Sequence, residues 1–249
     1  MSVKKKGAGR IILNETNSTN NYAMELIRDE KAENGMVIIT HHQTSGKGQR
    51  GKTWVTPPNT AITFSYLLDA DFLSPHQSFQ LLATTAVALR NWAAGYLGEK
   101  ETKLKWPNDL YWGDRKAGGI LIENVVRGKH WKWAVIGMGI NILQTEFPSN
   151  IGQPVSFLLA KGKQYNIEKL THELILALET ALTQLKTSGF EKIYAQYQQH
   201  LWKKDASITL QYKEERIEGK LLGVDTNGLL EVSGEKEFLF HFQDISWVI

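Results

Sequence analysis

The amino-acid sequence predicts an α/β (α+β) fold in which a larger domain, with a mixed sheet backed by helices, precedes a small β-barrel. Up to about residue 201, strand-like apolar segments alternate with segments whose apolar residues have helical spacing. From residue 207 the chain consists of short strands, in which apolar and polar residues alternate, joined by tight turns. The 42% of hydrophobic residues in 249 also suits a packed core. We therefore expect a basic tail over residues 1–9, the larger domain over 10–203 and the barrel over 204–249.

The first part of the larger domain is expected to contain strands, one helix and a long loop. Residues 10–14 read as a short apolar strand, and capping residues at 17–20 precede apolar positions at helical spacing. Further apolar strands are expected over 36–40 and 61–68. Between them, residues 41–59 are rich in glycine, proline and polar side chains, so we expect a glycine-rich loop without regular structure.

The second part of the larger domain is expected to complete the sheet and its helices. The apolar face of residues 78–96 predicts a helix that backs the sheet. The predicted β-rich segments that follow cover residues 110–112, 119–126 and 131–142, with a hairpin turn between the last two. Two amphipathic helices are then predicted, over residues 167–185 and 190–201.

The composition excludes several classes of protein. The chain has no cysteine, which excludes disulfides, thiolate zinc sites, iron–sulfur clusters and a cysteine nucleophile, and which fits a reducing, cytoplasmic location. Residues 72–89, the longest stretch without a charged side chain, include proline, histidine and glutamine, so no membrane association is expected. Four of the first ten residues are basic, and subtracting them from the net charge of +3 leaves −1, which argues against a nucleic-acid partner.

The glycine-rich segment GKGQRGKT at 46–53 matches two nucleotide-binding patterns, G-x-G-x-x-G and G-x-x-x-x-G-K-[ST]. Both patterns need a helix directly afterwards, whereas β-branched residues and two prolines follow here, so both interpretations are rejected. Free glycine N–H groups and the charges of Lys47, Arg50 and Lys52 still suit an anion or a carboxylate. A basic surface loop without a ligand is the alternative.

Three further segments carry residue types that suit phosphate chemistry. Lys105, Asn108 and Asp109 lie within five residues, where the carboxylate could hold magnesium and the amine could offset phosphate charge. Lys116 precedes a glycine pair at the start of a strand, and Asn141 follows two glycines at the end of another. The structural alternatives are an ordinary proline turn, a solvated lysine and a β-bulge.

Taken in order, five motifs resemble those of the biotin protein ligases (biotin–acetyl-CoA-carboxylase ligases). The motifs are STN at 18–20, QTSGKGQRGKTW at 43–54, KWPNDLYW at 105–112, RKAGGILIE at 115–123 and GMGIN at 137–141. The resemblance covers about residues 10–249 and implies an α/β catalytic domain followed by an SH3-like β-barrel. It also implies an enzyme that makes biotinyl-5′-AMP and pyrophosphate from biotin and ATP with Mg²⁺. The biotin then passes to a lysine of a biotin carboxyl carrier domain, which is the expected partner.

The resemblance implies a role for each motif. Lys116 would bridge the biotin carboxylate and the α-phosphate, while Lys105 and Asp109 would act on the phosphates, with Asp109 as a magnesium ligand. The residues that would bind biotin are Ser18, Thr19, Asn20, Gln43, Gly46, Lys47, Gly48, Gln49, Lys116, Gly119 and Ile120. The residues that would bind ATP or the adenylate are Arg50, Lys52, Trp54, Lys105, Asn108, Asp109 and Asn141, with Trp54 covering the adenine.

The sequence departs from the family pattern in two places. Many relatives have G-R-G-R in the loop, whereas Lys47 and Gln49 stand here at the arginine positions, which predicts weaker retention of the adenylate. Bifunctional relatives carry an N-terminal DNA-binding helix-turn-helix, whereas the first strand expected here begins near residue 10. We therefore expect the monofunctional form.

Two alternative functions stay open. A lipoate or octanoate ligase would share the fold, and the lack of cysteine excludes only the branch that uses a cysteine acyl intermediate, although KWPND favours biotin. A nucleic-acid-binding module could use the basic N-terminus and loop, but it would give Asp109 and Lys116 no role. A homodimer through an exposed sheet edge is also conceivable.

Overall fold

The computed structural model describes residues 9–148, 153–234 and 237–248. Its chain divides into two compact units, each assembled from two stretches of sequence. The units are Met1–Pro75 with Arg115–Glu173, and His76–Asp114 with Leu174–Ile249. The predicted division between residues 203 and 204 stays a prediction.

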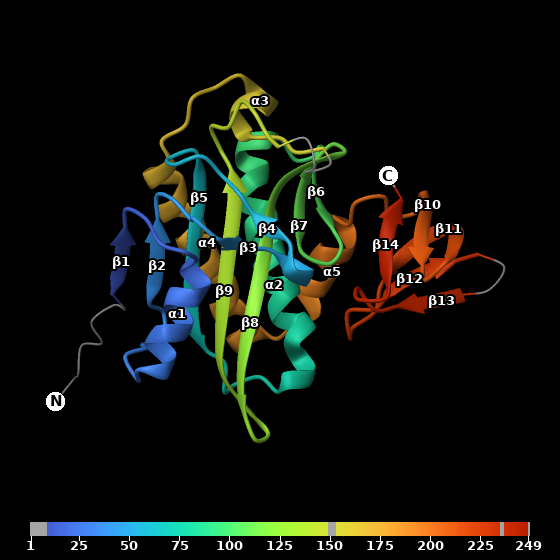
Figure 1. Ribbon diagram of the computed structural model, residues 1–249. Helices are drawn as coiled ribbons and strands as arrows, with labels where there is room; N and C mark the ends of the chain where they lie inside the picture. Colours follow the sequence, from blue (N-terminus) through green and yellow to red (C-terminus); the bar gives the residue numbers. More distant parts are fainter. Residues whose placement is uncertain (1–8, 149–152, 235–236, 249) are drawn as a thin grey trace. The chain divides into compact units, whose positions relative to one another are not determined.

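A mixed sheet forms the centre of the first unit (Figure 1). Its strands, in order across the sheet, are β1 (Arg10–Leu13), β2 (Val37–Thr40), β5 (Ala61–Asp69), β9 (His130–Asn141) and β8 (Arg115–Arg127). β1 pairs with β2 in parallel, and the other neighbours pair antiparallel. Eight of the nine residues of β5 are buried, as expected for an apolar strand inside a sheet. The predicted mixed sheet is confirmed.

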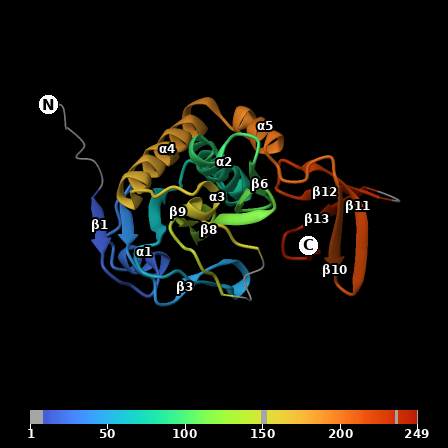
Figure 2. The same cartoon turned by 90° about the horizontal axis from the view of Figure 1, so that it is seen from above.

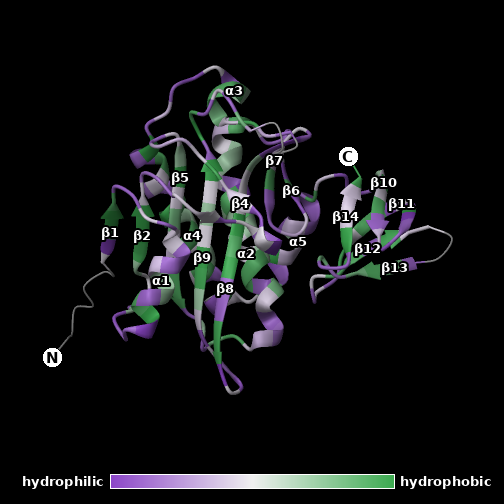
Figure 3. Cartoon of the chain, in the orientation of Figure 1, coloured by the Kyte–Doolittle hydropathy of each residue, from purple (hydrophilic) through white to green (hydrophobic). Residues whose placement is uncertain are grey.

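Helix α1 (Thr19–Arg28) lies along this sheet and contacts β2, β5 and β9 (Figures 1 and 2). Ala23 and Ile27 are four residues apart, so they share one helix face. They pack against the sheet residues Ile38, Leu67 and Val135. Hydrophobic residues also run along β2 and β8 in Figure 3. This packing fixes the N-terminus of α1 over the middle of the sheet.

The segment between β2 and β5 contains a short antiparallel hairpin of β3 (Gly46–Lys47) and β4 (Thr53–Trp54). The prediction of a wholly irregular loop is therefore wrong over these residues. Gly46 explains the difference, because its pairing with Trp54 leaves no room for a Cβ atom beside the Trp54 carbonyl oxygen. A further element that was not predicted, α3 (Phe157–Lys161), is capped by the Ser156 hydroxyl, which accepts from Leu159 N.

In the second unit, helix α2 (Ser78–Leu97) packs against α5 (Glu191–Gln199) and against a hairpin. The hairpin strands are β6 (Thr102–Lys105) and β7 (Asp109–Trp112), of which β6 was not predicted. Helix α4 (Ile167–Ser188) begins in the first unit and ends in the second. Among the described residues, no helix is long and apolar enough to cross a membrane.

The last part of the second unit is a five-stranded antiparallel sheet. Its strands are β10 (Ser207–Tyr212), β11 (Glu215–Val224), β12 (Leu230–Ser233), β13 (Glu237–Phe240) and β14 (Ile245–Val248). They are arranged in the order β13-β12-β11-β10-β14. The predicted series of short strands from residue 207 is confirmed, because the chain there carries alternating apolar residues between turn sequences.

Candidate functional site

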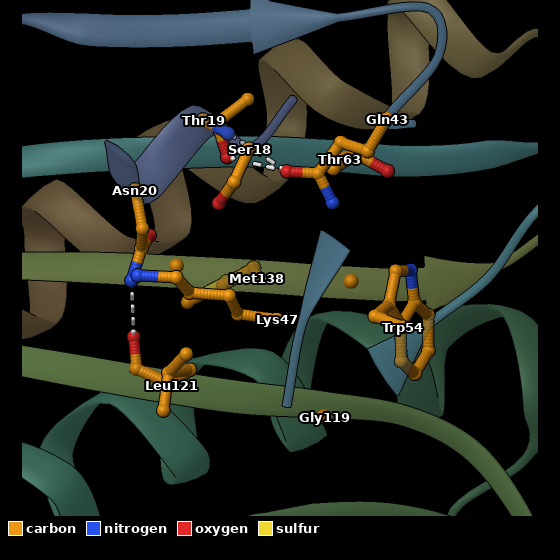
Figure 4. Close-up of a pocket in the computed structure, with 12 residues that line it drawn as sticks. Ser18, Thr19, Asn20, Gln43, Lys47, Trp54, Thr63, Gly119, Leu121 and Met138 are labelled. Atoms are coloured by element: carbon orange, nitrogen blue, oxygen red, sulfur yellow. Dashed lines mark hydrogen bonds between the residues drawn. The ribbon is translucent and has the colours of Figure 1, made fainter. Parts of the chain in front are cut away.

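A pocket lies between the sheet of the first unit and the N-terminus of α1 (Figure 4). Three strands supply its floor, because Thr63 of β5, Gly139 of β9 and Gly119 of β8 face one another in register. The neighbouring row, two residues along each strand, is Ser65, Gly137 and Leu121. Alternate residues of a strand share a face, so both rows lie on the same side of the sheet. The pocket encloses about 330 Å³ of empty space, its open mouth included.

Two glycines of β9 leave room for pocket-lining side chains close to the sheet backbone. A Cβ atom on Gly139 would lie 2.5 Å from Cε2 of Trp54, and one on Gly137 would overlap the side-chain oxygen of Asn20. Any larger residue at either position would displace a pocket-lining side chain. The GMGIN motif therefore lets Trp54 and Asn20 approach the backbone of β9 closely.

Hydroxyl and amide groups line the pocket wall at the start of α1. Ser18, Thr19 and Asn20 are each at most 3% exposed. The Thr19 backbone N–H donates to Oε1 of Gln43 at 2.8 Å, and the Thr19 hydroxyl donates to the same oxygen at 3.2 Å. Oγ of Ser65 lies 2.7 Å from the Thr19 hydroxyl and 2.6 Å from Oδ1 of Asn20, and its proton can go to one of them. The pocket wall is thus a network of neutral polar groups.

Glu123 adds a charged link to this network. Asn20 Nδ2 donates to Oε2 of Glu123 at 2.7 Å and to the Leu121 carbonyl at 3.4 Å, the latter drawn in Figure 4. The Lys47 ammonium lies 3.6 Å from Oε1 of Glu123. The two carboxylate oxygens therefore hold one group from the helix terminus and one from the hairpin.

The hairpin places its predicted ligand residues in two different environments. Lys47 and Trp54 line the pocket, and Nε1 of Trp54 is buried without a hydrogen-bond partner among the described residues. Gln49 is half-buried, whereas Arg50 and Lys52 are exposed on the turn, whose backbone is held by the bond from Gly48 N to Lys52 O at 2.7 Å. The roles predicted for Gly46, Gly48, Gln49, Arg50 and Lys52 stay predictions.

Three further predicted ligand residues, on β8 and β9, also lie outside the pocket lining. Ile120 is buried on β8 between the pocket residues Gly119 and Leu121. Lys116 is half-buried, and its backbone exchanges hydrogen bonds with residues 153 and 155. The Asn141 amide donates to the carbonyls of Lys116 and Val155 at 3.4 and 3.2 Å, so in this structure it holds the chain around Lys116.

The KWPND segment belongs to the second unit, in the turn between β6 and β7. Lys105 is only 8% exposed, and its ammonium donates to the Tyr111 hydroxyl at 3.1 Å. Burial, reinforced by the charges of Asp109 and Asp114, raises the pKa of Tyr111 far above its usual range, so this hydroxyl stays protonated. Asn108 is also 8% exposed. Asp109 lies opposite Lys105 in the register of the β6–β7 hairpin.

No group of three or more His, Asp or Glu side chains that could hold a metal gathers within the described parts of the chain. A magnesium ion that arrives with a nucleotide needs fewer protein ligands, because it keeps several waters and binds one or two carboxylates besides the phosphates. The half-buried Asp109 fits that pattern as a single carboxylate. Its predicted role as a magnesium ligand stays a prediction.

The structure places five of the predicted polar or charged ligand residues in this pocket, namely Ser18, Thr19, Asn20, Gln43 and Lys47, and other residues beside it were not predicted. Ser18, Thr19, Asn20 and Gln43 come together, although residues 18–20 and 43 are separated by a helix and a strand. Glu123 and Ser65 were missed. The signal for Ser65 was the alternation of Thr63 and Ser65 with apolar residues in AITFSYLLD, which puts both hydroxyls on one face.

Comparisons with known proteins show the family to which the chain belongs. The family model described as "Biotin/lipoate A/B protein ligase family" matches residues 12–141, just over half of the chain. The bifunctional ligase/repressor BirA of Bacillus spizizenii is 27% identical over 86% of this chain and 66% of its own length. The biotin–[acetyl-CoA-carboxylase] ligase of Paracoccus denitrificans is 26% identical over 90% of this chain and 93% of its own.

The solved structure of Aquifex aeolicus biotin protein ligase in complex with biotin and ATP superposes with a TM-score of 0.81. It is 22% identical and the match covers 96% of this chain and 97% of that one, so it shows a shared fold. The chain spans about two thirds of the length of the bifunctional relative from Bacillus spizizenii. The family expected from the five motifs is confirmed: this chain belongs to the biotin/lipoate A/B protein ligase family.

Proposed function

We propose that the chain is an ATP-dependent biotin protein ligase, which activates biotin as biotinyl-5′-AMP and transfers it to a lysine of a carboxyl carrier domain. The observation that carries this proposal is the pocket of hydroxyl and amide groups above a floor of glycines. A ureido ring has one carbonyl acceptor and two N–H donors, which suit the neutral donors and acceptors of Ser18, Asn20 and Gln43. The relatives described above bear the same activity in their names.

The first step would join two anions. An oxygen of the biotin carboxylate attacks the α-phosphorus of ATP, and the bond to the β-phosphate oxygen breaks, so that pyrophosphate leaves with the bonding electrons. Positioned cations must offset the repulsion between the carboxylate and the phosphates. We assign this role to Lys116 and Lys105, with Asp109 holding the magnesium ion that accompanies the phosphates.

The second step would transfer the acyl group. The neutral amine of the carrier lysine attacks the biotinyl carbonyl, AMP leaves, and the amine loses a proton to give the amide. Until the carrier arrives, the mixed anhydride must be protected from water. The β3–β4 hairpin is suited to this task, because Lys47 and Trp54 already line the pocket.

The proposal includes a carrier-domain partner and a cytoplasmic location, the latter because the chain has no cysteine that an oxidising compartment would pair. A homodimer stays a prediction. The edge strand β1 supports it, since β1 is the outermost strand on its side of the sheet and Ile12 is 61% exposed there.

The decisive test is pyrophosphate release from Mg·ATP with biotin, lipoate or octanoate added in turn. We expect release with biotin and at most a trace with the other two acids. Thr19→Val, which removes one hydroxyl of the pocket wall, is expected to raise the KM for biotin about tenfold, because Gln43 Oε1 loses one of its two hydrogen bonds from Thr19 and the Ser65 hydroxyl loses a partner. Release with lipoate or octanoate alone would keep the chemistry but overturn the substrate, and no release with any acid would reject the ligase.

A further inference from the structure

Lys105 lies inside a cluster of aromatic rings in the second unit. Its ammonium nitrogen is 5.0 Å from the ring centre of Tyr111, 5.2 Å from that of Trp202 and 5.3 Å from that of Trp247. The rings also touch one another, with centres 5.1 Å apart for Tyr111 and Trp202 and 5.3 Å apart for Trp202 and Trp247. We call Tyr111, Trp202 and Trp247 the aromatic cage.

The three cage residues come from different parts of the unit. Tyr111 lies on β7 beside the KWPND turn, and Trp202 follows α5. Trp247 lies on β14, an outer strand of the C-terminal sheet, paired with Leu210 of β10. The cage therefore ties the side chain of Lys105 to the C-terminal sheet.

A second contact ties the same turn to the same sheet. Nε1 of Trp106 donates to the carbonyl of Gly228, in the turn before β12, at 3.0 Å. The Tyr197 hydroxyl donates to the Pro107 carbonyl at 3.0 Å, from α5. The two residues that follow Lys105 are thus both held in place, and the C-terminal sheet supplies a ring for the Lys105 ammonium and an acceptor for Trp106.

An aromatic cage has a specific electrostatic effect. The faces of Trp202 and Trp247 attract the ammonium without cancelling its positive charge, and the Tyr111 hydroxyl accepts a hydrogen bond from it. The cation is then held in one place while it can still attract a phosphate. Restricting a long, flexible lysine before the reaction also removes part of the entropy that would otherwise be lost when it engages the substrate.

We infer that Trp247 is a positioning residue for Lys105, and that through it the C-terminal sheet takes part in the nucleotide step of the reaction. This inference rests on the proposed ligase function. The acid-binding pocket is made wholly of first-unit residues, so a change at Trp247 should affect ATP use and leave biotin binding intact. A merely structural tryptophan would give the opposite pattern, a loss of stability with kinetic constants unchanged for the folded fraction.

The test compares three variants in the biotin-dependent pyrophosphate assay, each titrated separately with ATP and with biotin. Trp247→Leu is expected to lower kcat/KM for ATP about tenfold, with the KM for biotin within twofold of wild type. Trp247→Phe, which keeps a ring face, should recover most of the loss. Val232→Ala is the matched control, because Val232 is buried in the same sheet on β12 and belongs to no part of the cage.

Each outcome has a defined meaning. An unchanged kcat/KM for ATP in Trp247→Leu would overturn the inference. The inference would also fail if kcat/KM for ATP fell equally in Trp247→Leu, Trp247→Phe and Val232→Ala, in proportion to their loss of thermal stability. No biotin-dependent release by the wild type would instead reject the proposed function. If Trp247→Leu does not fold, NMR of protein labelled with ¹³Cε-lysine tests the cage instead. The Lys105 signal, identified by its loss in Lys105→Met, is expected to be shifted by the rings and to move in Trp247→Phe. The absence of a shifted signal would overturn the inference.

Discussion

The pocket of the first unit and the KWPND turn of the second unit differ in the residues that surround them. Beside Lys47 and Trp54, the pocket consists mainly of glycines and neutral hydroxyls and amides, whereas Lys105 at the turn is surrounded by three large rings. Hydrogen-bond geometry in the pocket can discriminate between the heads of different acids. A fixed cation can attract the negative charge of phosphate groups, which all nucleotides carry. The two regions are thus suited to two parts of one reaction, the choice of acid and its activation.

The largest effect is expected for Lys116→Ala, which should lower pyrophosphate release by about 10²-fold to 10³-fold, the range typical for loss of a group that stabilises a transition-state charge. Arg115→Ala is the matched control, since this neighbouring guanidinium donates to the Pro154 carbonyl at 2.7 Å and has no predicted catalytic role. Equal rates for Lys116→Ala and wild type would remove Lys116 from the mechanism.

Gly139→Ala tests whether the pocket floor must stay empty. The added Cβ atom would meet Trp54 at 2.5 Å, so we expect the KM for biotin to rise at least about tenfold. Gly95→Ala serves as the control, because Gly95 is an exposed residue of α2 with open space around it. The account of the floor would be wrong if Gly139→Ala bound biotin as wild type does.

Glu123→Gln neutralises a carboxylate that contacts two pocket residues, Asn20 and Lys47. The ion pair with Lys47 would be lost while a hydrogen bond to Asn20 could remain, so we expect an increase of about threefold to fivefold in the KM for biotin. The KM for ATP should stay constant. A selective change in the KM for ATP would contradict the assignment of Glu123 to the acid pocket.

Gln49→Arg addresses the hairpin turn, where the sequence departs from the pattern of its relatives. A guanidinium at this half-buried position would add a charge-assisted contact for an anion, so the variant should release the adenylate a few-fold more slowly. Release can be followed with radiolabelled ATP after rapid gel filtration. Equal or faster release would show that residue 49 does not restrain the product.

The smallest effect concerns acid stability of the second unit. Burial, with the charges of Arg90 and Lys103, lowers the pKa of His200 below its ordinary value of 6.5. The unfolded chain then binds the proton more readily, so stability is intact above pH 6.5 and decreases as the pH falls below it. His200→Gln should reduce the difference in Tm between about pH 7.5 and about pH 5.5. An undiminished difference would exclude His200 as a contributor.

The two regions also differ in how far the sequence predicts them. The mixed sheet, α1, α2, α4, α5 and the five C-terminal strands follow from apolar periodicity, and Ser18, Thr19, Asn20 and Gln43 from motif order. Strand β6 was missed because TKLK alternates lysine with only one apolar residue, and its burial depends on α2. The aromatic cage was missed because Lys105 and Trp247 are distant in sequence and are brought together only by the folding of the second unit.

The measurement that tests this account most directly is a pair of titrations, of biotin and of ATP, on Asn20→Ala and Lys105→Met in the pyrophosphate assay. We predict that Asn20→Ala raises the KM for biotin about tenfold with little change for ATP. Lys105→Met should lower kcat/KM for ATP at least about tenfold with the KM for biotin unchanged. If both variants altered the same constant, or if Lys105→Met weakened only biotin binding, the division between an acid-selecting pocket and a caged cation for the nucleotide would be contradicted.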